Sequence, residues 1–286
     1  MRVVRRASEL RSLLDEQRRA GRTIGLVPTM GALHAGHLSL VRLARRTCDE
    51  VVVSVFVNPR QFGAGEDYDH YPRDTEGDLE LLEGERADIV FLPSVDDMYP
   101  PDATVVVTPG ALGDVFEGAD RPGHFDGVCT VVTKLFNIVE PDVAVFGQKD
   151  AQQVAVLKRM VNDLDFSLEL VVGPTVREGD GLAMSSRNAY LTQEQREQAL
   201  ALSRALELGR EVYLQSHEPH AAEEEMVRHL KGATGVELSY ASAVDPDTFE
   251  PPKPGGDHVL LIVAAHVGGT RLIDNLLIGS VRDEGD

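Results

Sequence analysis

Two histidines three positions apart, His34 and His37, are the residues of this chain best suited to chemistry by type and spacing. They lie in the stretch Pro28–Leu38 (PTMGALHAGHL), in which Gly31 and Gly36 stand close to them. An imidazole, whether neutral or charged, can donate a hydrogen bond to a phosphate oxygen. Free backbone N–H groups and the positive end of a helix dipole attract an anion at the same kind of place. We therefore expect this turn to bind phosphate.

The residues around this stretch predict a strand, a tight turn and a helix. Thr23–Val27 is a short apolar run rich in β-branched residues, which is typical of a buried strand. Apolar residues recur at helical spacing from Leu38 onward, and arginines occupy the opposite face. The histidines are thus expected at the carboxyl end of a strand and the amino end of a helix.

Two other interpretations of the histidine pair stay open. Imidazoles at this spacing on a helix can share a zinc ion, but no third ligand lies nearby in an obvious pattern. The turn could also be purely structural. Phosphate contact is favoured because glycine, histidine and a helix start coincide after a buried strand.

Two further polar turns follow apolar runs of strand length. Val51–Val57 leads into Asn58–Gly63, and Asp142–Phe146 leads into Gly147–Asp150. Strands and helices alternate along this half of the chain, which predicts an α/β fold with a Rossmann-like, doubly wound parallel sheet. Ligands of such sheets sit outside the carboxyl ends of the strands, so we expect all three polar turns to converge there. Val105–Val107 is a candidate for one more short strand.

The pattern changes near residue 175. Thr192 and Gln195 form a capping box before a long helical segment, a second helix follows, and three strand-like segments complete the chain. We expect residues 1–175 to form the Rossmann-like domain and residues 176–286 a smaller C-terminal α+β domain. An apolar stretch of the latter, Leu260–Val263, is a candidate for packing across a subunit interface.

Composition limits the classes of partner. The 286 residues include 28 basic and 47 acidic ones, a formal charge of −19, which argues against a nucleic-acid or anionic-membrane surface. A local basic pocket would favour a small anionic ligand. The two cysteines, Cys48 and Cys129, are too few for a disulfide framework and are expected to be reduced core thiols. The first residues lack the apolar core of a signal peptide, so we expect a cytoplasmic protein.

The common phosphate-binding motifs are missing. The chain has no Gly-x4-Gly-Lys-Ser/Thr sequence, and Gly63-Ala64-Gly65 lacks the third glycine of a dinucleotide fingerprint. Met184–Arg187 (MSSR) and Lys149 nevertheless supply the hydroxyl, guanidinium and ammonium groups that bind a polyphosphate. Taken alone, a charged pair such as Lys149-Asp150 is more often an exposed turn, and the short polar loop Met184–Arg187 is weak evidence for phosphate binding.

The ordered set of motifs is more specific than any one of them. It comprises Pro28–His37 (PTMGALHAGH), Phe56–Phe62 (FVNPRQF), Tyr71–Arg73 (YPR), Arg121–Val128 (RPGHFDGV), Phe146–Gln153 (FGQKDAQQ) and Met184–Asn188 (MSSRN). In this set the chain resembles the pantothenate synthetases (pantoate–β-alanine ligases), a family of the HxGH nucleotidyltransferase-like superfamily. The resemblance extends over nearly the whole chain.

The resemblance implies an AMP-forming ligase with ATP as co-substrate. In the first step the carboxylate of (R)-pantoate attacks the α-phosphate of ATP and forms pantoyl adenylate and diphosphate. In the second step the amine of β-alanine attacks the acyl carbon and forms pantothenate and AMP. The resemblance also implies a homodimer, and a second domain that acts as a lid and completes the ATP site.

The resemblance assigns roles to residues of this chain. His37, His34, Lys149 and Arg187 would be catalytic, with His37 as the proton donor. Pantoate would contact Gln61, Gln153 and Met30, and β-alanine would contact Gln61 and Arg121. ATP would contact Met30, Gly31, Ala32, Leu33, His34, Ala35, Gly36, His37, Gly147, Gln148, Lys149, Asp150, Val176, Met184, Ser185, Ser186 and Arg187.

No residue is assigned as a metal ligand. Mg2+ is expected with ATP, held through the phosphates as octahedral sites that retain water usually are. Asp78 is a candidate for an outer contact to the ion.

Two other functions remain as alternatives. A nucleotidylyltransferase on the same scaffold would need a pocket for an acceptor phosphate, whereas Gln61 and Gln153 suit a hydroxy acid better. A non-catalytic nucleotide sensor would be expected to lack a histidine or Lys149, and all three are present.

Overall fold

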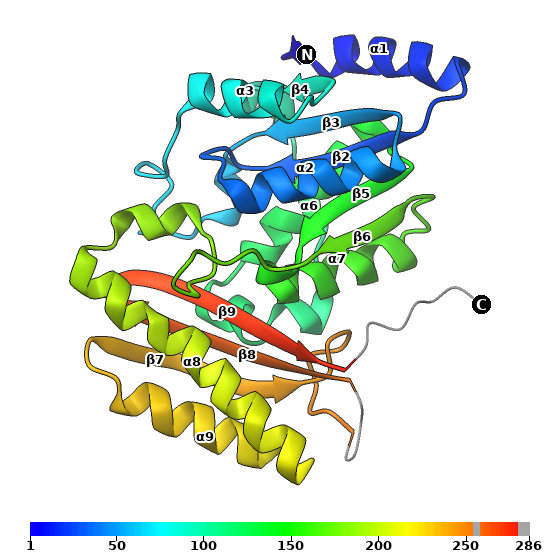
Figure 1. Cartoon of the computed structure of the whole chain (residues 1–286). Helices are drawn as coiled ribbons and strands as arrows, with labels where there is room; N and C mark the ends of the chain where they lie inside the picture. Colours follow the sequence, from blue (N-terminus) through cyan, green and yellow to red (C-terminus); the bar gives the residue numbers. More distant parts are fainter. Residues whose placement is uncertain (254–257, 280–286) are drawn as a thin grey trace. The chain divides into compact units, whose positions relative to one another are not determined.

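The computed structural model describes residues 1–253 and 258–279 (Figure 1). The chain divides into two compact units. The first comprises residues 1–147 and 156–174, and the second comprises residues 148–155 with the described residues from 175 onward. Residues 148–155 thus group with the C-terminal part although they precede the last strand of the first unit.

The first unit is built on a six-stranded sheet in which every strand pair is parallel. Its strands, in spatial order, are β1 (Arg2–Val4), β4 (Ile89–Phe91), β3 (Glu50–Val55), β2 (Ile24–Thr29), β5 (Val143–Gly147) and β6 (Glu169–Gly173). The chain winds outward from β2 in one direction through β3 and β4, and in the other through β5 and β6. This order confirms the predicted doubly wound α/β fold.

Strand β2 lies beside both β3 and β5, at the point where the winding direction reverses. It extends to Thr29, two residues beyond the predicted end at Val27. Pro28 is accommodated because β2 pairs with β5 only at Gly25 and Leu26, so the missing N–H of Pro28 interrupts no bond to β5. The histidine turn therefore leaves the sheet at its switch point, as predicted.

Helices cover both faces of this sheet. In Figure 1, α2 passes in front of the strands and α6 lies behind them. The helices that involve the first unit are α1 (Ala7–Arg19), α2 (Ala35–Thr47), α3 (Thr75–Gly84), α4 (Val95–Met98), α5 (Glu117–Asp120), α6 (His124–Val139) and α7 (Ala151–Asp163), of which α7 begins in the second unit.

The predicted strand at Val105–Val107 is wrong. These residues form no strand, and Val105 is 81% exposed. The segment is fixed instead by single bonds: Thr130 accepts the N–H of Val107, and Arg60 donates to the carbonyl of Ala103. A run of β-branched residues forms a strand only where a neighbouring strand offers a ladder.

Besides the first residues of α7, the described part of the second unit contains two long helices and a three-stranded antiparallel sheet, as predicted for an α+β domain. The elements are α8 (Gln193–Ser216), α9 (Pro219–Gly232), β7 (Val236–Val244), β8 (Val259–Val267) and β9 (Thr270–Ile278). Strand β8 is central, and its residues Leu260–Val263 are buried and paired with both neighbours. The suggestion that Leu260–Val263 packs across a subunit interface is therefore wrong.

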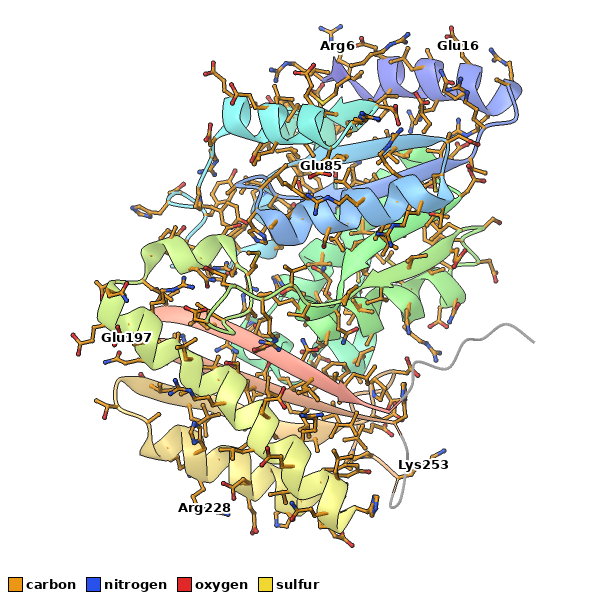
Figure 2. The ribbon with its side chains drawn as sticks, in the orientation of Figure 1. Arg6, Glu16, Glu85, Glu197, Arg228 and Lys253 are labelled. Carbon is orange, nitrogen blue, oxygen red and sulfur yellow. The ribbon has the colours of Figure 1, made fainter. Side chains whose placement is uncertain are left out.

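Charged residues occupy the outside of both units. Figure 2 shows the side chains of Arg6, Glu16, Glu197 and Arg228 pointing away from the ribbon, and all four are exposed. Cys48 and Cys129 are free and buried, as predicted. Burial raises the pKa of the Cys129 thiol to about 12. None of the helices in the described ranges is long and apolar enough to cross a membrane.

Candidate active site

The start of helix α2 is capped by the two histidines. Nδ1 of His34 accepts the backbone N–H of Gly36, and Nδ1 of His37 accepts the backbone N–H of His34. This is a capping box in which imidazoles replace the usual hydroxyl and carboxylate. The two rings lie face to face with a tilt of 32° and with their centroids 4.1 Å apart.

The capping bonds determine where the ring protons sit. A neutral imidazole carries one N–H, and because Nδ1 accepts in both rings, the proton of each is on Nε2. His34 and His37 can therefore each offer an Nε2–H donor without becoming charged. Such a pair suits the binding of phosphate oxygens, which is the chemistry that the sequence predicts here.

Asp78 fixes the turn that precedes these histidines. It belongs to the first turn of α3, and its buried carboxylate accepts the N–H groups of Ala32 and Leu33 at 3.0 and 2.7 Å. Burial raises the pKa of Asp78, and the two amide donors oppose that shift. A side chain at Gly31, where φ is +84°, would meet the same carboxylate, since a Cβ there would lie 2.8 Å from Oδ2. The N–H groups at Ala32 and Leu33 are thus already satisfied within the protein.

The turn after β3 presents Gln61 to Met30. Nε2 of Gln61 donates to Sδ of Met30 at 3.0 Å, and Oε1 of Gln61 accepts from Asn58. Asn58 is 1% exposed and is itself held, because its Oδ1 accepts the hydroxyl of Tyr99 at 2.8 Å and its amide donates to the carbonyl of Gly127. Two of the three predicted turns therefore meet within the first unit.

Burial raises the pKa of Tyr99 to about 12, so its hydroxyl remains a donor to Asn58 at neutral pH. Gly127 has no room for a side chain, since a Cβ there would lie 2.2 Å from the carbonyl oxygen of Arg60. Backbone and side chains thus enclose the Gln61 turn from several directions.

Arg121 lies on the backbone of the same turn. Its guanidinium donates to the carbonyl of Gln61 and, through two nitrogens, to both carboxylate oxygens of Glu66 at 3.0 and 2.6 Å. His124 completes the cluster, with Nδ1 2.8 Å from the carbonyl oxygen of Gln61 and Nε2 3.1 Å from Arg121. Burial and the neighbouring Arg121 lower the pKa of His124 to about 4, so its ring is neutral at physiological pH.

The second unit holds the predicted lysine. The chain leaves β5 at Gly147 and forms a single 3₁₀ turn over Gln148–Asp150, in which Nζ of Lys149 lies 3.6 Å from Oδ1 of Asp150. Gln153 follows in the first turns of α7. The Lys149 side chain is 21% exposed and that of Asp150 is 51% exposed.

The predicted polar loop of the second unit follows a short hairpin. Arg177 and Ala183 form an antiparallel bridge, and Met184 donates its N–H to the carbonyl of Val176. Ser185 then caps a 3₁₀ turn by accepting the N–H of Arg187. Ser185, Ser186 and Arg187 are all partly exposed and sit at the end of this hairpin.

Each unit thus brings a group of predicted residues together. Met30, the histidine turn, Gln61 and Arg121 belong to the first, and Gln148–Asp150, Gln153, Val176 and Met184–Arg187 belong to the second. Sequence patterns did not single out Glu66, Asn58, Tyr99 or His124 as partners. Asn58 and His124 lie within the quoted motifs and Glu66 lies four residues after one, whereas Tyr99 lies far from all of them and carries no signal in the sequence. In the described part of the chain, no three His, Cys, Asp or Glu side chains are grouped to hold a metal ion.

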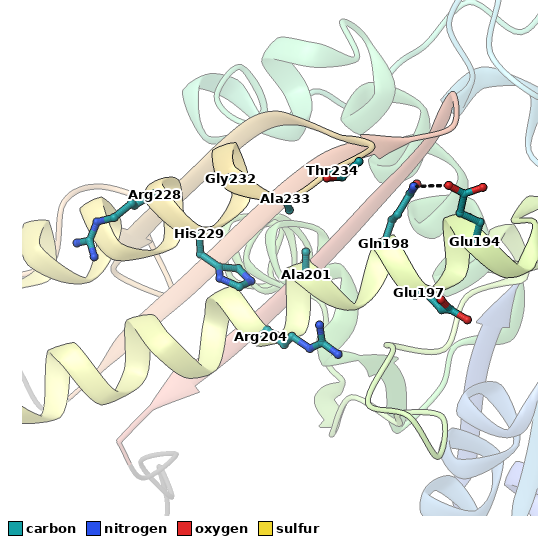
Figure 3. Close-up of a pocket in the computed structure, with 10 residues that line it drawn as sticks. All are labelled: Glu194, Glu197, Gln198, Ala201, Arg204, Arg228, His229, Gly232, Ala233 and Thr234. Atoms are coloured by element: carbon teal, nitrogen blue, oxygen red, sulfur yellow. Dashed lines mark hydrogen bonds between the residues drawn. The ribbon is translucent and has the colours of Figure 1, made fainter.

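A separate polar groove of about 580 Å³ runs along α8 and α9 in the second unit (Figure 3). Acidic Glu194 and Glu197 line one part of it, and basic Arg204, Arg228 and His229 line another. None of the predicted site residues lines this groove. It is distinct from the residues that the sequence marks for chemistry.

Comparison with known proteins identifies the family of this arrangement. Residues 2–277 match the family model described as pantoate–β-alanine ligase. A curated relative from Thermotoga petrophila, named pantothenate synthetase, is 52% identical over 280 residues that cover 98% of this chain and 100% of the relative. Another of the same name, from a Nocardioides species, is 57% identical over 94% of this chain and 82% of its own length.

Solved structures of high similarity carry the same description. Pantothenate synthetase from Thermus thermophilus has a TM-score of 0.93 at 47% identity, covering 98% of this chain and 100% of that one. Pantoate–β-alanine ligase from Francisella tularensis, solved with β,γ-ATP and β-alanine, has a TM-score of 0.79 at 33% identity and covers 97% of each chain. The chain presented here belongs to the pantoate–β-alanine ligase family.

Proposed function

We propose that this chain joins (R)-pantoate to β-alanine at the expense of ATP through a pantoyl adenylate. The observation that carries this route is the bond between Gln61 and Met30. The amide of Gln61 is suited to bind a hydroxy acid, and His34 is suited to bind phosphate. Because Gln61 is bonded to Met30, and Met30 precedes His34 by only four positions, Gln61 contacts the same turn that carries His34. An acid and a nucleotide phosphate must meet in this way for the acid to become an acyl adenylate.

Adenylation needs positioned donors around phosphorus and little covalent work by the protein. In our proposal the Nε2–H groups of His34 and His37 donate hydrogen bonds to phosphate oxygens. His37 keeps its proton, because a neutral ring that lost it would become an imidazolate, and its N–H stabilises the charge that develops on oxygen as the diphosphate departs. Lys149 and Arg187 stabilise the charge that accumulates on the β- and γ-phosphates. Ser185 and Ser186 assist them, and Asp150 accepts from the ribose hydroxyls.

Pantoate is proposed to contact Gln61, Gln153 and Met30. The amide of Gln61 is held in one orientation by Asn58, which supports its use as a fixed recognition group. The carboxylate of β-alanine is proposed to bind Arg121 beside the Gln61 backbone. In this structure the Arg121 guanidinium donates to the Glu66 carboxylate, so the carboxylate of β-alanine must compete with that of Glu66.

Mg2+ is proposed to arrive with ATP and to be held by its phosphates. The carboxylate of Asp78 already accepts two backbone N–H groups, so it is suited to no more than an outer contact. The ion would shield phosphate charge during adenylation. We also propose a homodimer in the cytoplasm, a location consistent with two free buried thiols and a need for ATP.

The proposal is tested by following oxygen atoms. The protein is incubated with ATP, Mg2+, β-alanine and pantoate whose carboxylate carries ¹⁸O. Transfer of one label to the phosphate of AMP, with equal yields of AMP and pantothenate, is the expected result. Unlabelled AMP would rule out the adenylate, and transfer of a nucleotide to a phosphate-bearing acceptor instead would favour a nucleotidylyltransferase.

A further inference from the structure

Strand β9 carries a buried amide that no motif of the sequence marks. Asn275 is 4% exposed, and its Nδ2 donates to the carbonyls of two successive residues, Gln148 at 3.0 Å and Lys149 at 2.8 Å. Its Oδ1 accepts from Nε2 of Gln148 at 3.2 Å. Both amide hydrogens and the oxygen of one side chain are thus used on a single turn.

The turn held in this way is the one that carries Lys149. It is only three residues long, and a 3₁₀ turn of that length has little stability of its own. Its first two carbonyls accept the two hydrogens of the Asn275 amide, so one side chain satisfies both. The position of the Lys149 backbone therefore depends on residue 275.

Asn275 is anchored to the buried central strand of its sheet. It is paired across the sheet with Ile262 of the central strand β8, in which Leu260–Val263 are at most 4% exposed. The preceding residue, Asp274, is 4% exposed and faces the other way. Its carboxylate binds the Arg177 guanidinium through two bonds of 2.6 and 3.0 Å.

Arg177 belongs to the hairpin that leads into Met184–Arg187, and it also donates to the carbonyl of Gly181. Two neighbouring residues of β9 are thus bonded to the two segments of the second unit for which we propose phosphate contacts. Asp274 supports the serine and arginine loop, and Asn275 supports the lysine turn.

We propose that Asn275 is a positioning residue for the adenylation step, acting through Lys149, with Asp274 in the corresponding role for Ser185–Arg187. Asn275 touches no substrate in this account. It fixes the backbone position of Lys149 and so aligns the Lys149 ammonium with the phosphates. The inference rests on the phosphate role proposed above for Lys149.

The test uses Asn275→Asp, which keeps the shape of the side chain but replaces two donors with an acceptor facing two carbonyls. Asn275→Ala removes the donors without adding charge and serves if the first variant does not fold. Leu238→Ala, in the partly buried apolar packing of β7, is the control for a general loss of stability in the second unit. Melting temperatures are measured for all variants.

Two half-reactions are then measured separately. Adenylation is followed as diphosphate release from ATP and pantoate, and aminolysis as pantothenate formation from supplied pantoyl adenylate and β-alanine. We expect Asn275→Asp to slow adenylation at least tenfold, with the KM for pantoate and the aminolysis rate within about twofold of wild type. The control should leave both rates unchanged at temperatures below its melting point.

A double-mutant cycle identifies Lys149 as the route of the effect. In the Lys149→Ala background, Asn275→Asp should slow adenylation by less than twofold further, because its effect is already lost. Equal factors in both backgrounds, equal losses in both half-reactions, or a wild-type rate in Asn275→Asp would each overturn the proposal. If Lys149→Ala alone leaves adenylation intact, the proposed role of Lys149 fails instead.

Discussion

His34 and His37 are joined by the cap of helix α2: each ring accepts a backbone N–H at Nδ1, and the two rings lie 4.1 Å apart. The same atoms that start the helix thereby fix the tautomer that offers Nε2–H to a phosphate. Structure and chemistry in this turn use different nitrogens of one side chain, so substitutions can separate them.

We expect His34→Asn and His34→Ala to differ in stability but not in activity. Asparagine retains an acceptor at the cap, so its free energy of unfolding should stay within about 0.5 kcal/mol of wild type, whereas alanine should lose about 1 kcal/mol. Both lack the Nε2–H donor, and adenylation should fall by about 100-fold in each. Urea unfolding and single-turnover kinetics measure the two effects. An active His34→Asn variant would refute the assignment of the imidazole to phosphate.

Asp78→Ala tests the support of the histidine turn. It leaves two N–H groups without their acceptor, which should cost about 2–4 kcal/mol of unfolding free energy and slow adenylation. Asp74→Ala is the matched control, since Asp74 caps the same helix α3 through one exposed bond to Gly77, and it should cost about 1 kcal/mol with activity retained. Equal behaviour of the two variants would mean that Asp78 is only a helix residue.

The pH dependence of stability should report His124. Its pKa is lowered to about 4 in the folded protein and is about 6.5 when unfolded, so the unfolded chain takes up a proton that the folded one refuses. The stabilisation is present above pH 6.5 and is lost as pH falls toward 4, by about 2–3 kcal/mol. His124→Asn should show a correspondingly flatter profile in this window. His220→Asn, at an exposed position, should follow wild type closely.

The Glu66–Arg121 pair predicts an effect on the second substrate. If the β-alanine carboxylate competes with Glu66 for Arg121, Glu66→Gln should lower the KM for β-alanine by about threefold to tenfold, since partly exposed ion pairs contribute about 1 kcal/mol. The pantoate KM should change little. Initial-rate kinetics with each substrate varied provide the measurement. A raised KM for β-alanine would instead assign Glu66 a supporting role at Arg121.

Local patterns predicted the sheet, its helices and the histidine turn, because these depend on periodicity and on caps within a few residues. The pairs Asp78–Leu33, Glu66–Arg121 and Asn275–Lys149 are 45, 55 and 126 residues apart in the chain. Such contacts are set by how elements pack, and a single buried polar residue leaves no periodic signal in the sequence. The wrong prediction of a strand at Val105–Val107 has the same cause. These residues have a high strand propensity, but no neighbouring strand in the described part of the chain packs beside them to form hydrogen bonds.

The most direct test of the account is a measurement of diphosphate in the absence of β-alanine. The protein, at a concentration comparable to that of ATP, is mixed with ATP, Mg2+ and pantoate, and diphosphate is followed over time. The adenylate route predicts a burst of about one diphosphate per active site, followed by steady turnover when β-alanine is added. Diphosphate that appears only after β-alanine is present, at the rate of pantothenate formation, would contradict a separate adenylation step.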